Sequence, residues 1–422
     1  MRIPLWWTAA VRRWLALLLA AAALFLACWI FINAPTRRLL PLSVGAPEVS
    51  HWLILASLAA VALAVAGVRD HAAARVAIAF ALPALWISLT PLMRLPATAR
   101  RVGEAARAAL RPQSPTVPGD ATKPPPRTSV LDFAELFGGV RLGDAAVTTG
   151  VAVATVEGVP LTVDVYRPAS HVAPPAGASS GVAAASGTLP IVVQVYGGAW
   201  QRGAPGDFSN FGRWLASRGY VVFSIDYRHA PHFRWPAQLD DVRTNLAWIR
   251  DHAAEWGGDA TRVALLGRSA GAQLAMLGAY TEGPLPIRAV VSFYGPVDLV
   301  DAYEHPPSPD PLKIREVEEA LFGGPLATMR ESYRLASPIA YATHPLPPTL
   351  LIHGGRDHIV EPRYGARLRD RLAATGTTVL LLDIPWADHA FDEVFNGPSS
   401  QLALYHVERF LAWAMRAPAA TP

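Results

Sequence analysis

The residues with the clearest capacity for chemistry lie around a serine between two glycines. Gly267, Ser269 and Gly271 fit the pattern G-x-S-x-G. An apolar run precedes them and an alanine-rich helical stretch follows, so we expect Ser269 on a tight strand-to-helix turn, where larger flanking side chains would collide. A chance match is the alternative, because small residues are common in this chain. The placement between strand and helix favours a serine nucleophile.

A serine hydroxyl is a weak nucleophile at neutral pH and needs a base, which an acid in turn orients. On this kind of turn the acid and the histidine follow the serine in the chain. Asp357 follows the apolar run 349–353, and His389 follows the run 379–384. Both lie just past predicted strand ends, where open α/β sheets place their sites. We therefore predict that Ser269, Asp357 and His389 form a catalytic triad.

Other histidines and aspartates near these runs are weaker candidates. His353 lies within a predicted strand and is expected to pack in the core or behind the site, and His358 is expected in a loop. Three further aspartates could orient a base, although Asp357 has the better position: Asp383, Asp388 and Asp392.

A glycine pair earlier in the chain predicts a site for a negatively charged oxygen. Gly197, Gly198 and Ala199 follow the continuous apolar run 191–196. Glycine lets backbone N–H groups approach a substrate carbonyl closely, and such groups stabilise an oxyanion. An ordinary turn is the alternative. We predict an oxyanion hole from this loop and the amide of Ala270. Ala199 has a Cβ atom but keeps its N–H, which can donate if its φ is negative.

The elements that must position these residues occupy residues 129–422. Strand and helix signals alternate there, which predicts an α/β fold with a mostly parallel, doubly wound sheet. A hairpin around Glu157 and Gly158 opens it, and residues 299–335 lack strands and are predicted to form a cap. Further strands are predicted at 191–196, 220–226, 263–266, 289–294, 349–353 and 379–384, and helices at 208–218, 236–256, 270–280, 362–374 and 400–415.

The front of the chain is of a different kind. Residues 14–32, 52–68 and 76–93 carry no charge and are each about long enough for a membrane span. A cleaved signal peptide is the alternative for the first run, and buried soluble helices for the others. Residues 1–127 hold 14 Lys and Arg against 4 Asp and Glu, within a net charge of +4 for all 422 residues. Because this basic excess flanks apolar runs, it indicates a bilayer and not a nucleic acid as partner.

We therefore predict about three transmembrane helices within residues 1–110, a proline-rich extended linker at 111–128, and the α/β catalytic domain at 129–422. Basic residues are balanced between the two sides, so the positive-inside rule has little to act on. The tendency of the first helix to dominate places the N-terminus inside the cell. Three spans would then make this an integral, multi-pass protein with its C-terminal domain outside the cytoplasm.

These motifs together resemble the α/β-hydrolase superfamily, over roughly residues 147–415. The stretches YGGAWQRG, IDYRHAPHFRWPAQLDDV, ALLGRSAGAQLA, TLLIHGGRD and WADHAF carry the likeness. They are most similar to hormone-sensitive-lipase-like and feruloyl-esterase-like carboxylesterases, and related variants occur in prenylcysteine methylesterases. The resemblance implies the triad and oxyanion loop given above, and implies that Asp226 and Arg228 brace a loop.

The chain departs from this family pattern at two positions. Tyr196 stands where histidine is usual and cannot reproduce an imidazole contact. Arg268 precedes the nucleophile, where an acid is common. This arginine predicts either a negatively charged or headgroup-bearing substrate, or a rim charge without consequence.

The function predicted is a membrane-anchored serine carboxylesterase or lipase-like hydrolase that forms an acyl-enzyme on Ser269. It needs no metal or organic cofactor, and its substrate is a small-molecule or lipid ester. Acyl transfer on the same triad and a non-catalytic membrane scaffold are the alternatives. The single cysteine, Cys28, excludes a disulfide framework. The cap is expected to set acyl selectivity through aromatic residues such as Phe322 and Tyr333.

Overall fold

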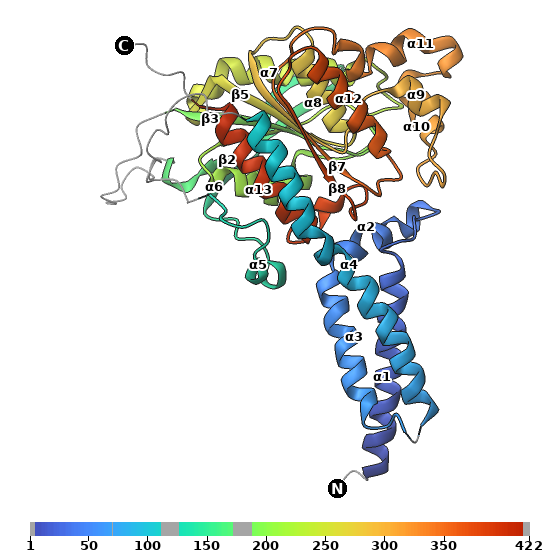
Figure 1. Cartoon of the computed structure of the whole chain (residues 1–422). Helices are drawn as coiled ribbons and strands as arrows, with labels where there is room; N and C mark the ends of the chain where they lie inside the picture. Colours follow the sequence, from blue (N-terminus) through green and yellow to red (C-terminus); the bar gives the residue numbers. More distant parts are fainter. Residues whose placement is uncertain (1–4, 70, 111–125, 172–187, 417–422) are drawn as a thin grey trace.

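The computed structural model describes residues 5–69, 71–110, 126–171 and 188–416. It consists of a bundle of long helices, here called the front bundle, and a larger α/β body above it (Figure 1). Most of the predicted linker at 111–128 lies outside the described residues.

The body is built on one eight-stranded sheet with the order β1-β2-β4-β3-β5-β6-β7-β8. The first two strands run antiparallel to their neighbours, and all later pairs are parallel. The predicted mostly parallel sheet is therefore confirmed. The strands are β1 (Ala145–Val156), β2 (Val159–Pro168), β3 (Leu189–Val195), β4 (Val221–Ile225), β5 (Gly258–Arg268), β6 (Ile287–Phe293), β7 (Thr349–Gly354) and β8 (Val379–Ile384).

Local sequence explains the strands. All residues of β3, β4 and β7 are buried, as expected for continuous apolar runs covered on both faces. The opening hairpin turns at Glu157 and Gly158, whose φ angles of 48° and 79° are both positive. Such a two-residue turn matches the natural twist of the paired strands.

Helices cover both faces of the sheet. On one face α6 (Ser209–Ser217) and α13 (Pro398–Ala414) pack together in one core cluster. On the other face lie α7 (Ala237–His252), α8 (Ala270–Tyr280) and α12 (Pro362–Ala374). The helix predicted at 236–256 ends earlier, at His252, and a 3₁₀ turn (Ala253–Trp256) follows it. A short helix, α5 (Phe133–Gly138), precedes the sheet.

The predicted cap segment, residues 299–335, is here called the insert. It forms three short helices and no strand: α9 (Leu299–Glu304), α10 (Ile314–Phe322) and α11 (Leu326–Leu335). Phe322 and Tyr333 are buried within it, with their ring centroids 3.9 Å apart. These two aromatic rings stabilise the insert itself. The side chains that it offers to a substrate are therefore others.

The front bundle contains α1 (Leu5–Cys28), α3 (Ser50–Val65) and α4 (Ala72–Ala109). At its body end lie a 3₁₀ turn, η1 (Arg37–Leu39), and α2 (Leu40–Glu48). By length and composition α1 and α4 could each cross a membrane. The predicted span at 52–68 is too short alone, because α3 ends at Val65, and it reaches that length only as a bent pair with η1–α2, at 78°.

The front bundle has small residues inside and large apolar residues outside. Its interior clusters are rich in fully buried alanines, such as Ala20, Ala60 and Ala77. In the described chain, all but three of the exposed large hydrophobic side chains lie between Val11 and Met93. This arrangement suits helices that pack closely against each other and present their large side chains to lipid.

The second half of α4 lies on the body. Leu95 and Val102 are buried in the same core cluster as residues of α13 and β8. Arg101 also forms an ion pair with Asp383 on β8, at 3.3 Å. The sequence predicted a third span at about 76–93 and an extended linker at 111–128. The helix instead continues to Ala109 and covers the edge of the sheet.

This packing predicts the effect of a charge on α4. Val102→Asp should destabilise the full chain by about 3 kcal/mol, because it removes buried apolar surface and leaves a carboxyl without a partner. Ala108→Asp, on an exposed position of the same helix, should change stability little. Thermal unfolding in detergent measures both. Equal melting temperatures would show that α4 does not support the body.

Candidate active site

The candidate nucleophile lies on a turn that only glycine neighbours allow. Ser269 joins β5 to α8 with φ 51° and ψ −125°. A Cβ atom at Gly267 would come within 2.2 Å of the Gly271 carbonyl oxygen. A Cβ atom at Gly271 would come within 2.1 Å of the Tyr196 carbonyl oxygen. The strained turn therefore depends on both glycines, as the motif suggested.

The structure brings the three predicted triad residues together from three separate elements. His389 Nε2 lies 3.0 Å from Ser269 Oγ, and His389 Nδ1 lies 2.8 Å from Asp357 Oδ2. Asp357 follows β7, and His389 follows β8. This hydrogen-bond chain lets the imidazole accept the serine proton while the carboxylate holds its orientation.

Asp357 is kept ionised by its surroundings. Burial would raise its pKa, but the charge of His389 and hydrogen bonds from His353 and His389 hold the pKa well below its ordinary value. Its second oxygen, Oδ1, accepts backbone N–H groups from Ile359 at 2.9 Å and Val360 at 2.8 Å. A fixed, charged carboxylate suits the role of orienting an imidazole.

The neighbouring histidines have other partners. His353 lies behind Asp357, with Nε2 2.6 Å from the Val360 carbonyl and 3.4 Å from Asp357 Oδ2. His358 Nδ1 lies 2.9 Å from Asp388 Oδ1, which also accepts the backbone N–H of His389. Asp388 therefore holds the loop of His389 and does not touch its ring.

The loop after β3 has unusual backbone geometry. Gly198 has φ 125°, where a Cβ atom would lie 2.1 Å from the Arg202 carbonyl oxygen. Ala199 has φ 56°, so the condition of a negative φ stated for this residue is not met. Within the described part of the chain, the backbone N–H groups of Ala199 and Ala270 have no hydrogen-bond acceptor. Both residues line the cavity beside Ser269, as Gly198 also does on its outer side.

Tyr196 anchors this loop through its own contacts. Its hydroxyl donates to Asp226 Oδ1 at 2.5 Å and lies 2.9 Å from His229 Nε2. Its ring stacks on Tyr227, with centroids 4.5 Å apart. Arg228 binds the buried Asp241 at 2.8 Å. Asp226 and Arg228 thus lie where the family resemblance implied bracing residues.

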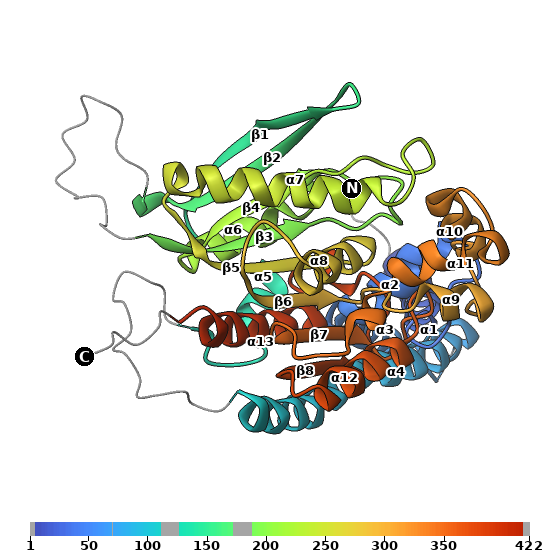
Figure 2. The ribbon, with the colours of Figure 1, turned by 90° about the horizontal axis from the view of Figure 1, so that it is seen from above.

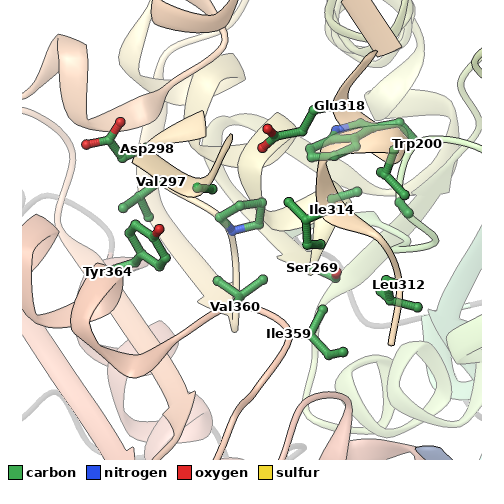
Figure 3. A pocket seen from close by; sticks show the side chains of 15 residues that line it. Trp200, Ser269, Val297, Asp298, Leu312, Ile314, Glu318, Ile359, Val360 and Tyr364 are labelled. Carbon is green, nitrogen blue, oxygen red and sulfur yellow. The ribbon is translucent and has the colours of Figure 1, made fainter. Parts of the chain in front are cut away.

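The space around Ser269 has two parts. The first, here called the inner pocket, has a volume of about 40 Å³ and a mostly apolar lining, with Leu312, Ile314, Ile359 and Val360 close to the serine (Figure 3). The second, here called the outer cleft, is larger, at about 1320 Å³. Ser269 and Ala199 border both spaces, whereas His389 borders only the outer cleft.

Two carboxyl groups also border the inner pocket, Asp298 and Glu318. Glu318 is buried, and burial raises its pKa well above the ordinary value. Among the described residues, no three His, Cys, Asp or Glu side chains are grouped as ligands for one metal ion. The chemistry open to this arrangement is nucleophilic attack by serine on an acyl carbon.

Comparison with known proteins agrees with this geometry. Residues 182–372 match the BD-FAE family model, a span that includes Ser269 and Asp357. The probable carboxylic ester hydrolase LipM of Mycobacterium tuberculosis is 31% identical over 240 residues, covering 54% of this chain and 55% of LipM. A probable isoprenylcysteine alpha-carbonyl methylesterase of rice, ICMEL1, is 28% identical, covering 45% of this chain and 48% of that protein. The chain thus spans about half the length of these curated relatives.

Solved structures settle the fold. A bacterial heroin esterase superposes with a TM-score of 0.55 at 21% identity, covering 66% of this chain and 87% of that chain. Esterase 2 of Thermogutta terrifontis with bound propionate gives a TM-score of 0.51 at 22% identity, covering 67% of this chain and 98% of that chain. The body has the α/β-hydrolase fold. The resemblances predicted from the motifs to esterases and to prenylcysteine methylesterases are confirmed.

One of the two interpretations that the sequence offered for Arg268, a rim charge, is wrong. Arg268 is not at the rim, because its side chain is only 1% exposed, although it is among the residues that line the outer cleft. Its Nε donates to Asp392 at 2.5 Å, and its guanidinium lies over the rings of Phe208 and Phe211 at 4.0 and 4.4 Å. Arg268 therefore packs beneath the turn of Ser269. Asp392 is the partner of this arginine and not the acid of the candidate triad.

Sequence reasoning also missed residues that only packing reveals. Tyr294 lies against the imidazole of His389, with ring centroids 4.6 Å apart, and its hydroxyl donates to Asp392. Gln273 accepts a hydrogen bond from the Trp200 indole at 3.0 Å and donates one to the Ala336 carbonyl at 2.6 Å. It thus joins the loop after β3 to the residue that follows the insert. A buried glutamine one turn after the nucleophile was the available signal.

The hydrogen-bond chain predicts how substitutions in the candidate triad affect activity. Ser269→Ala should lower kcat by about 10⁴- to 10⁶-fold, and His389→Ala nearly as much, because the two act as one unit. Asp357→Asn should be somewhat less damaging. The double variant Ser269→Ala/His389→Ala should be little worse than either single variant. Hydrolysis of a chromogenic butyrate ester measures this, and additive losses would contradict the assignment.

Proposed function

We propose that the protein is a membrane-anchored serine hydrolase of carboxylic esters. The observation that carries this proposal is the chain of hydrogen bonds from Ser269 through His389 to Asp357. The names of the relatives support it, since LipM is a probable carboxylic ester hydrolase and LipC an esterase.

In the proposed reaction, Ser269 Oγ attacks the ester carbonyl carbon while His389 Nε2 takes the hydroxyl proton. The amides of Ala199 and Ala270, with the loop of Gly197 and Gly198, stabilise the negative oxygen. His389 then gives its proton to the departing alcohol, which leaves an acyl group on Ser269. A water molecule, activated by the same imidazole, releases the carboxylic acid and restores the serine.

Anchoring in a bilayer is proposed from the front bundle. Its exposed apolar side chains and alanine interior would be unfavourable in water but are suited to lipid. Its described chain begins at the end far from the body, and α4 returns to the body (Figure 1). An N-terminus inside the cell would therefore place the body outside the cytoplasm.

Labelling with a fluorophosphonate probe tests the function directly. The purified full chain in detergent should be labelled, and Ser269→Ala should not. Release of acid from short esters should follow the same pattern, whereas a scaffold with an inactive site would neither label nor release acid. Added acceptor alcohol distinguishes acyl transfer, because a transferase would form a new ester in place of free acid.

The inner pocket predicts the acyl preference. A volume of about 40 Å³ has room for only a few non-hydrogen atoms, so short acyl groups should react best. Ile314→Ala enlarges the pocket and should raise the ratio of kcat/KM for hexanoyl over acetyl esters, by roughly three- to thirtyfold. Phe322→Ala, buried in the insert away from the pocket, should lower both rates evenly. An unchanged ratio in Ile314→Ala would show that acyl groups bind elsewhere.

A further inference from the structure

The two spaces beside Ser269 divide an ester into its acyl and alcohol parts. In the proposed reaction the departing alcohol oxygen takes its proton from His389 Nε2. His389 borders the outer cleft and is absent from the lining of the inner pocket. The alcohol part must therefore lie in the outer cleft, and the acyl part in the inner pocket.

The volumes of these spaces differ greatly. The inner pocket holds about 40 Å³ and the outer cleft about 1320 Å³. A cavity of several hundred Å³ or more is typical for a whole ligand, whereas the inner pocket suits a few atoms. The site is thus shaped for an ester with a small acyl group and a much larger alcohol.

One side of the outer cleft is made by the front bundle. Leu40, Pro41, Val44 and Gly45 of α2 line it, together with Arg37 of η1. The insert lines another side, with Pro311, Leu312 and Val317. Seen from above, α2 lies on the same side of the body as α9, α10 and α11 (Figure 2). Residues at the body end of the front bundle therefore form part of the wall of the outer cleft, which Ser269 and His389 also border.

Buried contacts hold α2 in this position. Glu48 at its end accepts hydrogen bonds from Ser399 Oγ at 2.5 Å and from Ser399 N at 3.0 Å. Leu40 packs against an apolar cluster of the bundle and against one of the body. Before α2, Asn33 Oδ1 accepts from Arg356 at 2.8 Å, and Arg356 is the residue before the catalytic Asp357. These contacts fix the helix as a built side of the cleft.

The same helix continues into the part of the chain that suits lipid. After Val49 the chain bends by 78° into α3, where Trp52, Leu55 and Leu58 are exposed. An apolar group lying on Leu40 and Val44 is thus next to the end of the bundle. An amphiphile could keep its tail in the bilayer while its ester group reaches Ser269.

We propose that α2 (Leu40–Glu48) is the binding surface for the alcohol part of the substrate, and that the substrate is a short-chain acyl ester of a membrane-resident lipid alcohol. This inference rests on the proposed esterase function and on its bilayer anchor. It adds a role for the front bundle in substrate recognition, beyond holding the body at a membrane.

Gly45 provides the sharpest test. It lines the cleft, and a Cβ atom there would meet no other atom within 4 Å. Gly45→Trp therefore places a large side chain in the cleft without a clash at its own Cβ. Gly103 on α4 is a matched control, because it is also a helical glycine with nothing within 4 Å and lies outside the cleft lining.

The experiment uses the full chain in phosphatidylcholine vesicles and two butyrate esters. Ethyl butyrate and hexadecyl butyrate give the same acyl-enzyme, so they differ only on the alcohol side. Release of butyrate gives kcat/KM for each. Gly45→Trp should lower the ratio of hexadecyl to ethyl butyrate by at least about tenfold, and Gly103→Trp should leave the ratio at the wild-type value. Val44→Ala, a smaller change, should lower it by roughly three- to tenfold.

The outcomes separate the two proposals. An unchanged ratio in both Gly45→Trp and Val44→Ala overturns the assignment of α2, even if ethyl butyrate is hydrolysed. A wild-type chain that prefers ethyl butyrate and long acyl groups overturns the division into acyl and alcohol spaces. Failure of the wild type to hydrolyse either ester or to react with a fluorophosphonate refutes the proposed function itself. Equal fluorophosphonate labelling of wild type and variants confirms that the variants are folded.

Discussion

The tight turn between β5 and α8 is the constraint on which the rest of the site depends. Ser269 adopts a positive φ there, at a cost of about 1–3 kcal/mol, which the buried strand before it and the buried helix after it offset. The turn also approaches the loop after β3 so closely that Gly271 faces the Tyr196 carbonyl without room for a side chain. One close contact therefore fixes Ser269 relative to the loop after β3.

Asp357 and Arg268, two charged residues buried near this turn, each have a partner of opposite charge, which lowers the free-energy cost of burying them. Asp357 lies between two histidines and two backbone N–H groups. Arg268 and Asp392 form a second pair beneath the turn, next to the ring of Tyr294 that contacts His389. The imidazole is thus held by its carboxylate on one edge and by an aromatic ring on its face. Rigidity of this kind keeps the reacting groups at the distances that catalysis requires.

The front bundle and the body are joined more closely than a flexible tether would allow. The end of α4 covers the edge of the sheet with Leu95 and Val102, and α2 is fixed by Glu48 and Ser399. The helix α4 therefore has two parts. Its first half presents large apolar side chains outward, and its second half packs apolar side chains against the core of the body. The same joint brings α2 to the outer cleft, so the geometry of the bundle and the geometry of the site are linked.

The sequence by itself determined those features that depend on neighbours in the chain. The glycine spacing predicted the turn at Ser269, continuous apolar runs predicted the buried strands, and Glu157-Gly158 predicted the hairpin. The position of Asp357 and His389 after strands was enough to predict that they lie close to Ser269, because parallel strands end at one edge of a sheet.

Only the tertiary structure decided what lies across the site from these residues. The charge of Arg268 gave no sign that Asp392, far along the chain, would bury it. The aromatic residues of the insert were expected at the substrate, yet Phe322 and Tyr333 pack on each other while Ile314 faces the pocket. The uncharged runs predicted a membrane segment but not that α2 would line the cleft. Periodicity and composition report which side chains avoid water, but which surfaces meet depends on the three-dimensional packing of distant segments.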